Sequence, residues 1–208
     1  SHGFRNNELN NNSNNILMLG DSMTFGWGAK APFANILDKK INNFQVINAG
    51  IGNTNTNMQI NNFFTNFKDT FKYDLIILNF FINDFEEVIV EKPNLLQKYS
   101  YAYTYLSNTI NKILIKNSVK KNWNEFYSSL FNNDQISSEI FNNILKLNEY
   151  CKKNNIKFII HNIPELRNLK NYQFEKETNK IKNFAKKNNI KFINSHEDLL
   201  NFEEKDLW

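Results

Sequence analysis

Five short apolar segments recur along the chain, separated by longer stretches in which apolar residues return every three to four positions. The short segments are rich in Ile, Leu, Val and Phe, and they predict strands at residues 16–19, 44–47, 75–80, 157–160 and 191–193. The run Leu75-Ile76-Ile77-Leu78 is uninterrupted by polar residues. Because such a run suits a strand buried on both faces, the pattern favours a parallel sheet.

The longer stretches predict helices at residues 31–41, 55–67, 95–115, 122–131, 137–154 and 172–187. Alternation of strands and helices predicts a single α/β domain over residues 1–208, a doubly wound, five-stranded, mostly parallel sheet with helices on both faces. Residues 81–156 are far more than one crossover needs, so we expect a helical insertion at roughly residues 86–133.

The insertion is rich in aromatic residues, which could either pack a helical cap onto the domain or line a cleft beside the sheet. We favour packing, because large aromatic side chains are usually buried. These residues are Tyr99, Tyr101, Tyr103, Tyr105, Trp123 and Tyr127.

Composition narrows the classes of protein that the chain can belong to. With 208 residues, 41% hydrophobic and 22% charged, the chain is expected to fold as one globular domain. No uncharged apolar stretch reaches about 18 residues, so we expect no membrane span. The net charge is +4, but the lysines occur as scattered pairs, and we therefore expect no nucleic-acid partner. A single cysteine, Cys151, excludes an internal disulfide and a multi-cysteine metal site.

Polar and glycine-rich segments follow three of the predicted strands. The first strand continues into Gly20-Asp21-Ser22-Met23, the second into Asn48-Ala49-Gly50-Ile51-Gly52-Asn53-Thr54, and the third into Asn83-Asp84. Ligands of open α/β sheets bind beyond the carboxyl ends of the strands. Three successive strand ends therefore offer a hydroxyl, a backbone donor and an amide donor, which are the parts required for acyl transfer through an oxyanion.

Each segment also has a simpler interpretation. Gly-Asp-Ser is common as a turn with a helix N-cap, Gly-x-Gly after a strand can cradle a phosphate, and Asn-Asp can cap a loop. It is the order of the three segments, each after a predicted strand, that favours a common site.

With these segments in that order, the sequence resembles the SGNH (GDSL-type) hydrolase family. The resemblance implies a flavodoxin-like fold with Ser22 as the nucleophile, and an oxyanion hole formed by the N–H groups of Ser22 and Gly52 and the side chain of Asn83. Residues 3–8 are similar to a lead-in segment found in many members. Such proteins are esterases, lipases, carbohydrate deacetylases or related acyltransferases, and they need no metal or other cofactor.

The chain departs from the family pattern at two places. Glycine usually stands two residues before the asparagine of the third segment, and here that residue is Phe81. The family's base belongs to an Asp-x-x-His motif after the fifth strand, which the sequence up to Trp208 lacks. We expect the Asp/His pair beyond Trp208, with Asp206 either structural or the aspartate of that pair.

The histidines of the chain are weaker candidates for the base. His2 lies next to the first residue, whereas His161 and His196 follow the fourth and fifth predicted strands. His196, with Asp198 two residues later, is the better placed of the two for this role.

The sequence thus predicts a serine esterase that removes or transfers a small acyl group. The resemblance to the SGNH family implies an O-acetyl group on a carbohydrate as the leading substrate. Its expected partner is a small-molecule or glycan ester. One alternative is a non-catalytic SGNH-fold domain that binds a glycan or an acylated ligand. Another is a flavodoxin-like binder of phosphate or nucleotide, which the absence of Gly-x-Gly-x-x-Gly disfavours.

Overall fold

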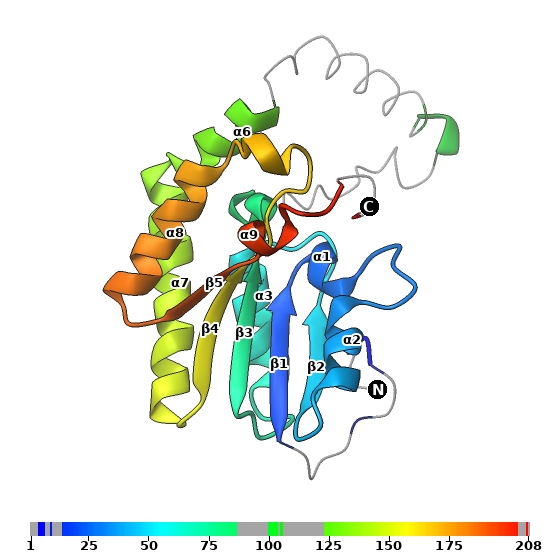
Figure 1. Cartoon of the computed structure of the whole chain (residues 1–208), viewed down its shortest axis with the longest axis vertical. Coiled ribbons are helices and arrows are strands. Elements are labelled where there is room, and N and C mark those ends of the chain that lie inside the picture. Colours follow the sequence, from blue (N-terminus) through cyan, green and yellow to red (C-terminus); the bar gives the residue numbers. More distant parts are fainter. Residues whose placement is uncertain are drawn as a thin grey trace.

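The computed structural model describes residues 4–6, 9, 14–86, 100–103, 105, 123–203 and 207. Its centre is a five-stranded sheet with the strand order β2-β1-β3-β4-β5 (Figure 1), and every neighbouring pair of strands is parallel. The strands are β1 (Asn15–Gly20), β2 (Gln45–Gly50), β3 (Leu75–Phe80), β4 (Lys157–Asn162) and β5 (Lys191–Asn194). The predicted α/β class and all five predicted strands are confirmed.

Helices cover both faces of this sheet, as the alternating pattern predicts. The longer ones are α2 (Phe33–Lys40), α3 (Thr56–Asn62), α6 (Trp123–Phe131), α7 (Asp134–Lys153) and α8 (Glu175–Lys187). Short elements are α1 (Ser22–Phe25), α9 (His196–Leu199), the π-helical turn η1 (Phe63–Phe67) and the 3₁₀ turns η2 (Ile82–Phe85) and η3 (Leu169–Asn171).

Side-chain alternation along the strands divides the core between the two faces. On one face, α3, α7 and α8 bury residues such as Ile60, Ile144 and Ile181 against the sheet. On the other face, Ala34 of α2 packs in a smaller cluster with Ile16, Met18 and Val46. Burial of β1 on both faces explains why its residues 16–19 are all apolar.

Asparagine side chains define several helix ends. Asn133 accepts hydrogen bonds from the N–H groups of Gln135 and Ile136 at the start of α7, and Asn55 caps α3 in the same way through Met58. The helix predicted over residues 55–67 is present, but it consists of α3 followed by the π-helical turn η1.

The N-terminal segment lies along the edge strand β2. The Asn6 side chain donates to the carbonyl of Val46 and accepts from the N–H of Asn48, and the N–H of Arg5 donates to the Asn48 carbonyl. These bonds satisfy backbone groups that an edge strand would otherwise expose.

Most of the expected insertion, including Tyr99 and the greater part of the predicted helix at residues 95–115, lies outside the described residues. Burial of its aromatic residues is confirmed for Tyr127, whose hydroxyl donates to Glu86 at 3.0 Å, but it is wrong for Tyr101, Tyr103 and Tyr105, which are exposed. Among the helices that the structure describes, none has the length and apolar character required to cross a bilayer.

Candidate active site

Helix α1 begins immediately after β1 and carries Ser22 at its first position. Asp21 is its N-cap, and the Asp21 carboxylate accepts a hydrogen bond from the N–H of Met23 at 2.8 Å. The helix ends after one turn at Gly26, which adopts the left-handed conformation and donates to the Ser22 carbonyl. Ser22 is therefore held in a short, sharply bounded turn at the carboxyl edge of the sheet (Figure 1).

Two glycines allow α1 to sit this close to the strands. A Cβ atom on Gly20 would lie 2.0 Å from the Thr24 hydroxyl oxygen, and one on Gly50 would lie 2.3 Å from the backbone nitrogen of Phe25. No side chain fits at either position without displacing the turn that carries Ser22. The glycines at the ends of β1 and β2 are therefore required by packing.

Asp21 joins the side chains of Ser22 and Asn83. The Ser22 hydroxyl donates to the Asp21 carboxylate at 3.4 Å, and a hydrogen bond from the Asn83 side chain reaches the same carboxylate. Burial raises the pKa of Asp21, and the hydrogen bonds from Met23, Asn83 and Ser22 oppose that rise. The ends of β1 and β3 thus bring the expected nucleophile and the expected amide donor to one carboxylate.

A second buried carboxylate, Asp84, shapes the turn that carries Asn83. Asp84 accepts from the N–H of Phe81 at 2.8 Å and from the side chain of Gln59 at 2.7 Å. Complete burial, with the nearby charge of Asp21, raises the pKa of Asp84 well above its ordinary value. Phe81 itself is buried in the core cluster, so this departure from the family pattern does not obstruct the site.

Gly52 lies across from Ser22 on the loop after β2. A Cβ atom built on Gly52 would be 3.9 Å from the Cβ of Ser22, so the two residues face one another. Neither backbone N–H has a hydrogen-bond partner among the described residues. An amide side chain has two N–H donors, and the single bond from Asn83 to Asp21 leaves its second donor available.

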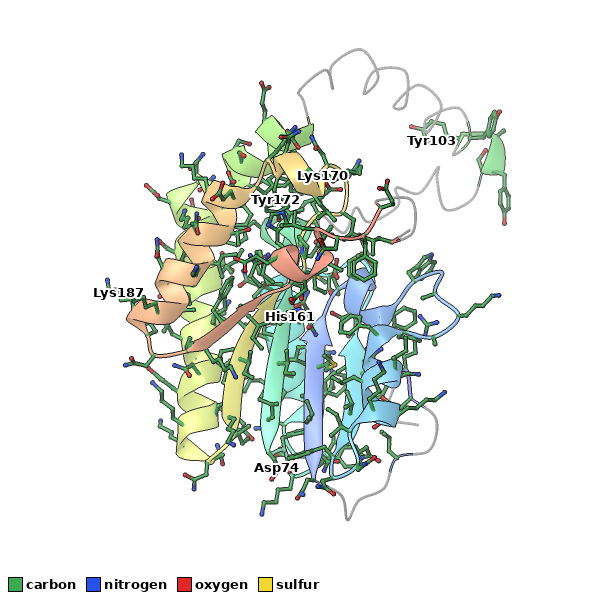
Figure 2. All side chains as sticks on the ribbon, in the orientation of Figure 1. Asp74, Tyr103, His161, Lys170, Tyr172 and Lys187 are labelled. Carbon is green, nitrogen blue, oxygen red and sulfur yellow. The ribbon has the colours of Figure 1, made fainter. Side chains whose placement is uncertain are left out.

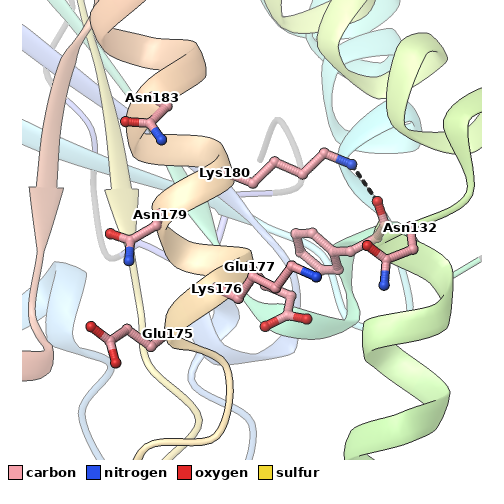
Figure 3. Close-up of a pocket in the computed structure, with 8 residues that line it drawn as sticks. Asn132, Glu175, Lys176, Glu177, Asn179, Lys180 and Asn183 are labelled. Carbon is pink, nitrogen blue, oxygen red and sulfur yellow. Dashed lines mark hydrogen bonds between the residues drawn. The ribbon is translucent and has the colours of Figure 1, made fainter.

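The cavity beside Ser22 has a volume of about 510 Å³. Its other lining residues come from α1 and the loop after it, from the segment after β4 and from the C-terminal segment: Met23, Gly26, Trp27, Gly28, Ala29, Leu166 and Leu207. A larger cavity of about 580 Å³ lies between α6 and α8 (Figure 3), where Lys180 donates to the carbonyl of Phe131. That cavity does not include Ser22, so we take the smaller one as the candidate active site.

The two described histidines are hydrogen-bonded elsewhere, and neither bonds to Ser22. His161 on β4 lies 2.8 Å from the Asn79 side-chain oxygen through Nδ1 and 2.7 Å from the Ser195 hydroxyl through Nε2. His196 bonds to the Leu169 carbonyl at 2.8 Å and stacks on Tyr172 with ring centroids 4.4 Å apart. His161 and Tyr172 both lie close to α9 (Figure 2). His2 and Asp206 are outside the described residues.

Within the described ranges, no three His, Cys, Asp or Glu side chains converge in a way that could hold a metal ion. The hydrogen-bond donors near Ser22 are the backbone N–H groups of Ser22 and Gly52 and the side-chain amide of Asn83, whereas the Asp21 carboxylate is an acceptor. The N–H donors are suited to binding a developing negative charge on oxygen.

Several solved structures share the fold of this chain. AlinE4, described as an SGNH-hydrolase family esterase, aligns with a TM-score of 0.56 over 97% of this chain and 85% of its own, at 18% identity. The chain has the SGNH-hydrolase fold. The acetyl xylan esterase AlAXEase aligns with a TM-score of 0.53 over 93% of this chain and 83% of its own, at 15% identity. TesA aligns at 0.52, over 86% and 76%, at 12% identity. No protein-family model and no curated protein sequence matches the chain.

The sequence predicts Ser22, Gly52 and Asn83 as site residues but does not predict that Ser22 and Asn83 are joined. The link between these two is the Asp21 carboxylate, which the sequence suggests only as an N-cap. The sequence analysis also does not identify Trp27, which lines the Ser22 cavity and is largely exposed. The flanking glycines Gly26 and Gly28 are the available signal, because they bound a loop in which the side chain between them is displayed.

Proposed function

We propose that the protein is a serine ester hydrolase in which Ser22 attacks the carbonyl carbon of a small acyl ester. The observation that best supports this proposal is that the Ser22 hydroxyl and the Asn83 amide both donate hydrogen bonds to the Asp21 carboxylate. Ser22 also lines a cavity of about 510 Å³. The SGNH fold of the chain, found in esterases, supports the same assignment.

In the proposed reaction, the Ser22 Oγ forms a bond to the carbonyl carbon as its proton leaves to a base. The carbonyl oxygen becomes an oxyanion, and the N–H groups of Ser22 and Gly52 and the free amide N–H of Asn83 stabilise it. Collapse of the intermediate breaks the ester bond, and the leaving oxygen takes the proton back from the base and departs as the alcohol. Water then attacks the acyl-serine, which releases the acid and restores the hydroxyl.

The leading substrate is an O-acetyl group on a carbohydrate. A neighbour with the same fold is named an acetyl xylan esterase, and the cavity beside Ser22 has room for a sugar ring. This part of the proposal concerns the substrate alone, so the reaction type does not depend on it.

The first test compares the protein with Ser22→Ala in the hydrolysis of p-nitrophenyl acetate. We expect Ser22→Ala to remove the activity, because no other described hydroxyl combines this cavity with these donors. A fluorophosphonate probe should label Ser22 covalently in the unmodified protein and should not label the variant. Equal turnover by the two proteins would contradict the proposal.

The base is addressed by His161→Gln and His196→Gln. Both rings are already hydrogen-bonded away from Ser22, so we expect each variant to keep Ser22-dependent turnover. Loss of turnover in His196→Gln, with an unchanged melting temperature, would assign that residue as the base.

The second candidate function is a non-catalytic binding domain. The specific observation that favours it is that no described histidine bonds to the Ser22 hydroxyl. Binding of an acetylated oligosaccharide without any Ser22-dependent turnover would support this alternative and exclude the hydrolase.

A further inference from the structure

The side chain of Trp27 lies beside Ser22 and is largely exposed to water. Its exposed fraction is 78%, and it lines the same cavity as Ser22. The indole Cε3 is 3.8 Å from the point where a Cβ on Gly52 would stand, and that point is 3.9 Å from the Ser22 Cβ. An exposed aromatic face therefore adjoins both the proposed nucleophile and the proposed oxyanion loop.

The backbone around Trp27 is fixed by hydrogen bonds. The Trp27 N–H donates to the carbonyl of Ser22 at 3.1 Å. Its neighbours Gly26 and Gly28 have φ angles of 75° and 79°, a conformation that glycine adopts without steric cost. The indole is thus presented by the same turn that carries Ser22.

Arg5 reinforces this loop from the N-terminal segment. Its guanidinium donates to the carbonyls of Phe25, Gly26 and Ala29 and lies 4.5 Å from the centroid of the Phe25 ring. A planar group with several donors can hold three carbonyls in one arrangement. A rigid loop that exposes a large aromatic side chain is preorganised for a ligand.

We propose that Trp27 is a stacking platform for the sugar ring that carries the ester, and that it forms a pyranoside subsite next to Ser22. This proposal rests on the hydrolase function proposed above. A pyranose ring has a face of C–H groups, whose partial positive charge complements the negative face of an indole.

The exposure of Trp27 also bears on the kind of ligand. The hydroxyl groups at the rim of a sugar remain hydrated when one ring face is stacked, so a platform that is 78% exposed suits it. A long alkyl chain gains most where it leaves water completely. The apolar residues Met23 and Leu166 at the cavity wall are then left for the small acyl group or the ring edge.

Binding is tested without turnover in the Ser22→Ala background, with O-acetylated xylotriose as the probe in isothermal titration calorimetry. We expect Trp27→Ala to weaken binding about tenfold, near the upper end of what one aromatic contact contributes. Trp27→Phe should retain part of the affinity. Phe44→Ala is the matched control. Phe44 is an exposed aromatic residue at the amino end of β2, whereas Trp27 lies beyond the carboxyl ends of the strands.

The active protein provides the second measurement. In Trp27→Ala, KM for the acetylated oligosaccharide should rise about tenfold, and kcat/KM should fall several-fold more for the oligosaccharide than for ethyl acetate, which has no ring. Unchanged binding in Trp27→Ala, no detectable binding in the Ser22→Ala background, or an equal loss with ethyl acetate would each overturn the sugar subsite. A loss confined to long-chain acyl esters would also overturn it, by assigning Trp27 to the acyl group.

Failure of the proposed function gives a different result from failure of this subsite. If no ester shows Ser22-dependent turnover, the hydrolase proposal fails, while calorimetry still decides whether Trp27 binds the sugar. If Ser22-dependent turnover occurs and Trp27→Ala leaves both binding and KM unchanged, the subsite fails alone.

Discussion

The Asn83 side chain donates a hydrogen bond to Asp21 and is also the proposed third donor to the oxyanion. We predict that Asn83→Ala lowers kcat for p-nitrophenyl acetate by on the order of 10²–10³-fold, the usual effect of removing one such donor. KM should change little, since the donor acts on charge that develops in the transition state. A large rise in KM with an unchanged kcat would contradict the oxyanion role and indicate a binding role instead.

His161 lies at the centre of a second hydrogen-bonded chain. The Asn79 amide nitrogen donates to the carbonyl of Leu19 at 3.0 Å, so its oxygen faces His161 Nδ1 and accepts that proton. Nε2 is then free to accept from the Ser195 hydroxyl. The chain connects β1, β3 and β4 to the residue that precedes α9.

Burial lowers the pKa of His161 from 6.5, against the opposing charge of Asp198. The unfolded chain therefore binds a proton at this residue at a higher pH than the folded protein does. Stability from this group is complete above the unfolded pKa and is lost as the pH falls below about 6.5 towards the lowered pKa of the folded protein.

We predict that this loss is smaller in His161→Gln, which can still donate and accept hydrogen bonds but does not titrate. The measurement is the urea midpoint at pH 7.5 and pH 5.5 for both proteins. Taking the difference between them removes the effects of Asp21 and Asp84, whose raised pKa values act in the opposite direction. An identical pH dependence in the two proteins would show that His161 does not carry it.

Among the elements, β2 ends at Gly50 and the loop after it contains Gly52, and these two glycines are needed for different reasons. A Cβ on Gly50 would lie 2.3 Å from the Phe25 nitrogen, whereas one on Gly52 would meet nothing closer than 3.8 Å. We predict that Gly50→Ala costs about 1–3 kcal/mol of stability, since the backbone of α1 must move. Gly52→Ala should stay within about 0.5 kcal/mol of the unmodified protein.

Gly52→Ala, the variant that should keep its stability, is the one that we expect to lose activity. The new methyl group in Gly52→Ala points between Trp27 and Ser22, so we expect kcat/KM to fall about tenfold or more through misplacement of the ester. Urea denaturation and p-nitrophenyl acetate kinetics measure the two effects. A stable Gly52→Ala with full activity would mean that the ester does not occupy this space.

Strand positions can be predicted because burial on both faces requires an uninterrupted apolar run. The third strand at residues 75–80 is predicted to the residue, and β2 is predicted too short because Asn48 interrupts its pattern. Asn48 is buried there because its side chain bonds to the Thr24 carbonyl and the Gly50 N–H. Such compensation joins residues far apart in sequence, so local periodicity does not reveal it.

The candidate site can also be predicted only in part from the local sequence. Residues that follow a strand can be assigned to one sheet edge from order alone, which is how Ser22, Gly52 and Asn83 are predicted to share one site. The support that Arg5 gives to the Trp27 loop, and the chain from Asn79 through His161 to Ser195, depend on side-chain directions. Those directions are settled only when the strands are paired in register.

In the molecule as a whole, the hydrophobic cluster on one face of the sheet is much larger than the cluster on the other face. The larger cluster, under α3, α7 and α8, contains the single cysteine of the chain, Cys151, which is completely buried near the end of α7. Burial raises the pKa of this thiol to about 12. Since the thiolate is the reactive form, Cys151 should be inert in the folded protein.

Labelling of Cys151 by 5,5′-dithiobis(2-nitrobenzoic acid) should therefore report on unfolding of the larger core. We predict a rate in native buffer that is limited by the open fraction, and full reaction within the mixing time in 6 M guanidinium chloride. Ile144→Ala removes a buried side chain from the same cluster and should cost about 2–5 kcal/mol. Labelling should then accelerate about tenfold per 1.4 kcal/mol, whereas Ile36→Ala, at an exposed position on α2, should leave the rate unchanged. Rapid labelling of the unmodified protein would place a local opening at the end of α7, because only access without global unfolding could expose this thiol so quickly.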